Sequence, residues 1–133
     1  MNTPLTSVER QLLDSLLRQC KVTLPKDHPA YGPNAVTSRE NTGAGLYINF
    51  DNIHIDPDLG SFRAVEQVHQ FLLSYEWDIL FDSLLYLTAD NSPHMIELFH
   101  YGHSDNPAKW NGDLSSFRLI DDEEFSRYES QNR

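Results

Sequence analysis

The chain has 133 residues, a length at which one hydrophobic core buries about two-thirds of the surface that the unfolded chain exposes. Hydrophobic residues make up 39% of it and aromatic residues 11%, so we expect a single domain spanning residues 1–133 that folds without metal, cofactor or disulfide. Twenty acidic against ten basic residues give a formal net charge of −10, which disfavours nucleic acid and anionic lipid and predicts a basic partner.

The lone cysteine, Cys20, excludes an internal disulfide. The N-terminus has no basic region followed by an apolar stretch, and the longest apolar runs of the chain reach only about four residues. We therefore expect a cytoplasmic protein with no membrane-spanning segment.

A capping box marks the start of the first predicted helix. In the run Thr6-Ser7-Val8-Glu9 the Thr6 hydroxyl can accept the backbone N–H of Glu9, while the Glu9 carboxylate reaches back to the cap. Apolar residues then recur at the spacing of one helix face. We predict an amphipathic helix over residues 7–20 with a buried stripe of Val8, Leu12, Leu13, Leu16, Leu17 and Cys20.

Prolines and glycines among polar residues predict a long loop over residues 23–45, a candidate contact or lid segment. Alternating apolar residues from Leu46 to Ile55 then predict strand structure, with a parity change at Asp51-Asn52 that indicates either a tight hairpin or one bulged strand. A second helix is predicted from about residue 61 to residue 74, although the run Phe71-Leu72-Leu73 also fits a strand.

The clearest hairpin signal follows in residues 84–101. Two apolar runs, residues 84–88 and 94–101, flank a polar turn that contains Pro93. A last short strand is expected at residues 117–120, and the acidic residues 121–133 are expected to form a flexible tail. The predicted fold class is α+β, with two helices packed on a mostly antiparallel sheet.

Motifs for catalysis or metal binding are weak. His100 and His103, with Asp105 and Glu97 nearby, form the one cluster of possible metal ligands, but strand alternation points His100 away from Glu97. Cys20 lies on the apolar helix stripe, where a thiol is inert, and no Gly-x-Ser-x-Gly motif is present. We predict no catalytic residue and no bound metal.

Acidic residues alternate with aromatic residues in several polar segments. Such a combination provides aromatic anchors inside a negative field, which suits the rapid capture of a basic partner. The alternative is that both tryptophans are half-buried at the edge of the core. The predicted partner-binding residues are Asp56, Asp58, Glu76, Trp77, Asp78, Asp105, Trp110 and Asp113.

Three segments carry a resemblance: the helix that opens at residues 5–13, the strand at residues 45–50, and the hairpin of residues 84–87 and 95–99. Together they resemble small acidic bacterial immunity proteins, the cognate inhibitors of toxins in contact-dependent growth inhibition systems. The resemblance implies a protein that binds and neutralises a basic toxin, often a nuclease, by covering its active site or substrate groove. No functional residue is carried over from the family.

Three other functions remain open from the residues alone. The chain can be an interaction domain that stabilises a partner without inhibiting it. The loop around Tyr31 can cover a pocket for a small ligand. The many carboxylates can also converge in a hydrolytic site, which would require a deep pocket.

Overall fold

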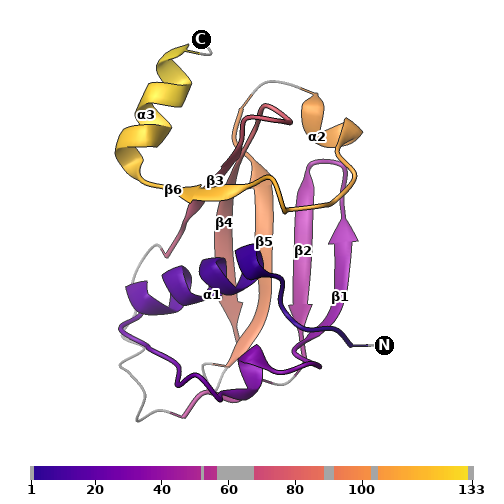
Figure 1. The fold of residues 1–133 in the computed structure, drawn as a ribbon, viewed down its shortest axis with the longest axis vertical. Helices are drawn as coiled ribbons and strands as arrows, with labels where there is room; N and C mark the ends of the chain where they lie inside the picture. Colours follow the sequence, from indigo (N-terminus) through magenta and orange to yellow (C-terminus); the bar gives the residue numbers. More distant parts are fainter. Residues whose placement is uncertain (1, 52, 57–67, 89–91, 103–104, 132–133) are drawn as a thin grey trace.

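Six strands form one antiparallel sheet in the order β1-β2-β5-β4-β3-β6, as Figure 1 shows. The computed structural model describes residues 2–51, 53–56, 68–88, 92–102 and 105–131. The strands are β1 (Val36–Asn41), β2 (Gly45–Phe50), β3 (Phe71–Ser74), β4 (Ile79–Leu87), β5 (Pro93–His100) and β6 (Arg118–Ile120). The helices are α1 (Ser7–Gln19), the short 3-10 helix η1 (Pro29–Tyr31), α2 (Asn106–Lys109) and α3 (Asp122–Gln131). The predicted α+β class is confirmed.

Helix α1 begins at the predicted capping box. The Thr6 hydroxyl accepts the backbone N–H of Glu9 at 3.3 Å, and the Glu9 carboxylate accepts the backbone N–H of Thr6 at 2.8 Å. The helix ends at Cys20, which is buried as predicted. Four leucines of the predicted stripe are at most 1% exposed, so this stripe is the face that packs on the sheet: Leu12, Leu13, Leu16 and Leu17.

An ion pair joins the start of α1 to the edge strand β1. Glu9 is only 1% exposed, and its carboxylate accepts two hydrogen bonds of 2.7 Å from the guanidinium of Arg39. Arg39 also donates to the Thr3 hydroxyl at 2.6 Å and to the Pro4 carbonyl at 2.9 Å. The same guanidinium therefore holds the N-terminal segment, the helix and β1 together.

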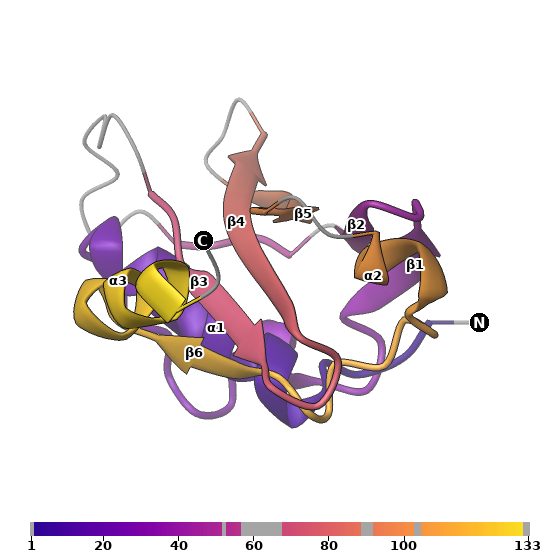
Figure 2. The same ribbon diagram turned by 90° about the horizontal axis from the view of Figure 1, so that it is seen from above.

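The two faces of the sheet differ in what covers them. Side chains alternate between faces along each strand, and one set packs against α1. In Figure 2 the sheet curves around α1. We call this side the inner face; its buried side chains include Leu46, Ile48, Leu72, Phe81, Ile96 and Leu98.

Helix α3 packs on the opposite side of the sheet, against β3 and β6. Phe125 stacks on Phe71 with ring centroids 4.0 Å apart, and Tyr128 packs against the same small cluster. The buried members of this second cluster are Phe71, Leu73, Leu80 and Ile120. The expectation of a flexible acidic tail at residues 121–133 is therefore wrong for residues 122–131, because two aromatic side chains one helical turn apart anchor that segment.

Three other expectations need correction. The predicted loop over residues 23–45 contains strand β1. Its polar sequence does not indicate a strand, and its backbone hydrogen bonds come from pairing with β2. Residues 71–74 of the predicted second helix are strand β3, while its residues 61–67 lie outside the described part of the chain. Residues 53–56 are not a strand, although Ile53 and Ile55 are buried. The predicted hairpin is confirmed as β4 and β5.

We expect Arg39→Met to lower the free energy of unfolding by about 3 kcal/mol, because it leaves the Glu9 carboxylate buried without its partner. Adding Glu9→Gln should recover most of this loss, since the remaining side chain is neutral. Denaturant unfolding measures both effects. Arg18→Met, the same change at an exposed site of α1, is the control and should shift stability by about 0.5 kcal/mol or less.

We also expect Phe125→Ala to destabilise the protein by about 2 kcal/mol, because it uncovers the ring of Phe71. Ser126→Ala changes an exposed neighbour in the same helix and should have almost no effect. Thermal unfolding followed by circular dichroism compares the two variants. Equal stability would show that α3 does not dock on β3 in solution.

Candidate protein-binding surface

On the face of the sheet opposite α1, helix α3 covers β3, β6 and the start of β4, where Leu80 is buried. On β2, β5 and the rest of β4 the side chains of this face are partly exposed or exposed, whereas most of their neighbours on the inner face are buried. No described helix packs on this part of the sheet. We call it the outer face; it consists of Tyr47, Asn49, Asp82, Leu84, Tyr86, Met95, Glu97 and Phe99.

Strand register brings these residues together in rows across the three strands. Glu97 of β5 lies between Tyr47 of β2 and Leu84 of β4. In the next row Met95 lies opposite Tyr86, whose hydroxyl donates a 2.8 Å hydrogen bond to the Glu97 carboxylate. Tyr86 is 41% exposed. The result is an apolar patch with a carboxylate at its centre.

The charged groups of the outer face have one sign. Asp82 and Glu97 belong to it, and Glu40 of β1 pairs directly with Tyr47 at its edge. The described basic residues lie on other elements, or point to the inner face as Arg39 does. They are Arg10, Arg18, Lys21, Lys26, Arg39, Lys109, Arg118 and Arg127. The outer face is therefore locally acidic in a chain that is acidic as a whole.

An imidazole–carboxylate pair at the edge of the outer face was not predicted from the sequence. His69 Nδ1 lies 3.0 Å from Asp82 Oδ1, and the residues are thirteen positions apart, so spacing along the chain gives no signal. The hydroxyl of neighbouring Ser83 donates to the Gln70 carbonyl on the inner face. Ser83 therefore does not form a Ser-His-Asp catalytic triad with His69 and Asp82.

Four of the sequence-predicted residues meet at one end of the sheet. Glu76, Trp77 and Asp78 form the turn between β3 and β4, and Trp77 is half-buried against the core. Asn106 of α2 donates to the Trp77 and Asp78 carbonyls at 3.1 and 3.2 Å. These bonds bring Asp105 next to the turn, and the Asp78 carboxylate also accepts the hydroxyl of Tyr128.

The other predicted residues do not join this group. Trp110 is 3% exposed and packs in the core against Phe81, so the expectation of an exposed anchor at this position is wrong. Its indole N–H donates to the Asp113 carbonyl at 2.9 Å. Asp56 follows β2, which runs in the same direction as β4 and therefore ends away from the turn between β3 and β4. Asp58 lies outside the described residues.

The possible metal ligands are not brought together in the described part of the chain. No three His, Cys, Asp or Glu side chains gather there closely enough to hold a metal ion. His103 falls outside the described residues, and His100 points to the face opposite Glu97, as strand alternation predicts.

Among the described residues, no helix combines the length and hydropathy needed to cross a membrane.

The chain matches no family model, no curated protein and no solved structure at a significant level. Its function must therefore be argued from its own residues.

The hydrogen bond within the outer face gives a testable prediction. The pKa of Tyr86 is raised above its ordinary value. The main cause is the hydrogen bond to Glu97, which stabilises the neutral phenol, and the second cause is burial of the hydroxyl. We expect Glu97→Gln to lower this pKa, so that Tyr86 ionises at lower pH. Tyrosine ring resonances followed by NMR against pH measure the change, and Glu40→Gln, which removes a nearby acid without this bond, should leave it almost unchanged.

Proposed function

We propose that the chain is a binding protein that captures a basic protein partner on its outer face. The observation that carries the proposal is the exposed apolar patch of β2, β5 and β4, with acidic side chains and no described lysine or arginine. The patch is the open side of a sheet whose other side is filled by α1.

The composition of the outer face suits the centre of a protein interface. Tyrosine, phenylalanine and methionine are enriched in such centres because each buries a large area. The aromatic side chains have few rotatable bonds, and the flexible methionine side chain adapts its shape to the partner. Tyr47, Tyr86 and Met95 provide this area within adjoining rows. The carboxylates attract a basic partner over a longer range and align it.

Charge argues for a protein partner rather than nucleic acid. A formal net charge of −10 disfavours the long, uniformly charged backbone of a nucleic acid. A basic nuclease or other basic toxin has the opposite charge, since its groove is built to hold phosphate. We therefore propose the action of an immunity protein, in which the acidic face covers the active site or substrate groove of a cognate toxin.

The turn that holds Glu76, Trp77 and Asp78 is a second acidic and aromatic region, at the end of the sheet where β4 begins. Asp56 follows the end of β2 that points away from this turn, so one partner surface centred on the turn does not include it. Mutations in the outer face and in this turn therefore distinguish which of the two regions binds the partner.

The experiment is a capture of the tagged protein's partner from lysate of its own organism, at low salt and at about 0.5 M salt. The captured partner is then made pure, and its affinity is measured for variants. We expect Tyr86→Ala combined with Glu97→Lys to weaken binding by at least about tenfold, or 1.4 kcal/mol. Binding should also suppress the partner's toxic or nuclease activity.

Two charge reversals of equal size serve as comparisons. Asp27→Lys changes an exposed acid on the α1 side of the sheet and should leave affinity within about twofold of wild type. Glu76→Lys tests the turn between β3 and β4. A loss confined to Glu76→Lys would move the interface to that turn, and wild-type affinity for the outer-face variant would refute the outer face as the interface.

The main alternative is an interaction domain that stabilises its partner without blocking it. It uses the same surface, so affinity alone does not separate the two functions. A partner that keeps full activity in the saturated complex would establish the alternative.

A further inference from the structure

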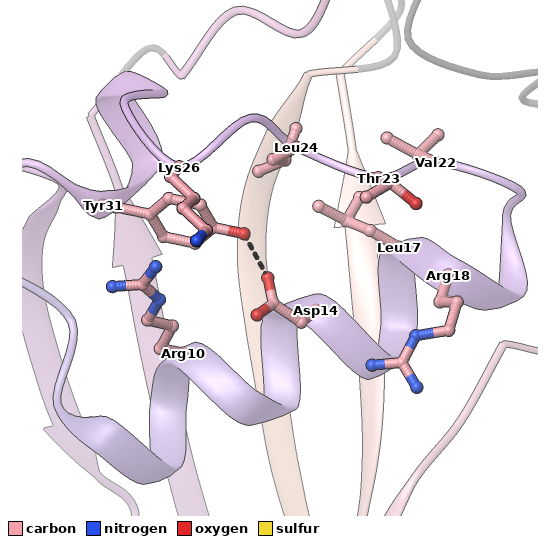
Figure 3. Close-up of a pocket in the computed structure, with 9 residues that line it drawn as sticks. All are labelled: Arg10, Asp14, Leu17, Arg18, Val22, Thr23, Leu24, Lys26 and Tyr31. Carbon is pink, nitrogen blue, oxygen red and sulfur yellow. Dashed lines mark hydrogen bonds between the residues drawn. The ribbon is translucent and has the colours of Figure 1, made fainter.

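A pocket of about 220 Å³ lies between α1 and residues 22–31, on the α1 side of the sheet (Figure 3). Three buried apolar side chains, Leu17, Val22 and Leu24, are among the residues that line it. Tyr31 forms part of its wall. Ligand sites commonly combine apolar lining with a few polar groups, and drug-sized ligands occupy about 300 Å³ or more, so this pocket suits a smaller molecule.

The charged residues around the pocket are mainly basic. Arg10, Arg18 and Lys26 line it together with a single acid, Asp14. Three basic residues and one acidic residue give a local formal charge of +2, in a chain whose total is −10. None of the three basic side chains forms an ion pair with a described residue.

The one acid of the pocket is already engaged. The Asp14 carboxylate accepts the hydroxyl of Tyr31, drawn as a dashed line in Figure 3. Burial, and then this hydrogen bond, raise the pKa of Tyr31 to about 12. Asp14 is thus held by the pocket wall and forms no ion pair with either arginine.

Arg10 is positioned by the same tyrosine. Its guanidinium carbon lies 3.9 Å from the centroid of the Tyr31 ring, a cation–π contact. Stacking uses the flat face of the guanidinium and leaves the N–H groups at its edge able to form two parallel bonds to a carboxylate or phosphate. Figure 3 shows Lys26 beside the same ring, with Arg18 further along α1.

We propose that this pocket binds a small organic anion, a carboxylate or phosphate group on a short apolar body. Arg10 and Lys26 bind the anionic oxygens. The apolar body contacts Leu17, Val22 and Leu24. This site is separate from the outer face, because it lies on α1 and the segment after it.

The test is an NMR titration of the ¹⁵N-labelled full chain with benzoate and, separately, with phenyl phosphate. We expect saturable shifts of the amides that line the pocket, and the stronger of the two probes identifies the anionic group. Benzamide has the shape of benzoate without its charge and should bind at least about tenfold more weakly. Inorganic phosphate should bind more weakly than phenyl phosphate, because it lacks the apolar body.

Variants link the binding to the named side chains. Arg10→Gln and Lys26→Gln should each weaken binding by about fivefold or more, while Lys21→Gln removes an exposed cation of the same segment that does not line the pocket and should have little effect. If Arg10→Gln displaces the Tyr31 ring that Arg10 contacts, the affinity of Lys26→Gln alone is the test of the charged contact. No saturable shift at about 20 mM, or equal binding of benzamide and benzoate, overturns the proposal.

Discussion

The buried carboxylate of Glu9 is the constraint on which the arrangement of the fold depends. It caps the first turn of α1 and, through Arg39, ties that turn to β1. A charge that is 1% exposed is tolerated only with partners in place, so the helix start and the sheet edge must form together. Once α1 is fixed in this way, its leucines fill the inner face, and the side chains of β2, β5 and β4 that point the other way are left without a described cover.

Two local regions of the protein carry charge of opposite sign. Acidic side chains lie among the aromatic residues of the outer face, while three basic side chains gather around the pocket beside α1. A total of −10 therefore conceals a local excess of positive charge. Because the two regions share no residue, a change in one tests its proposed ligand without altering the other.

Strong local patterns made part of this structure predictable. The capping box at Thr6 and Glu9 fixed the start of α1, and alternation revealed the β4–β5 hairpin. Strand β1 was missed because only Val36 of its six residues is buried, which leaves no alternation to detect. Strand β3 is four buried residues long, too short for periodicity to separate a strand from a helix.

Tertiary contacts decided what the sequence patterns left open. The sequence of α3 is typical of a solvated acidic end. Its anchoring residue, Phe125, is recognised only from its contact with Phe71, which is distant in the chain. Trp110 stands among polar residues, yet its indole N–H finds a carbonyl partner that allows burial. The outer face was missed for a related reason: its members come from three strands, and their register, set by β5, places them together.

Strand β5 has a further consequence for the order in which the fold assembles. The β1–β2 and β3–β4 pairs are hairpins between strands that are neighbours in the chain, and each can close early. β5 comes later in the sequence and inserts between them, pairing with β2 on one side and β4 on the other. Until residues 93–100 have left the ribosome, each hairpin carries an unpaired apolar edge that is open to mispairing. Because β4 and β5 are themselves neighbours in the chain, β5 can pair with β4 locally, and its pairing with the distant β2 then closes the second edge and completes the sheet.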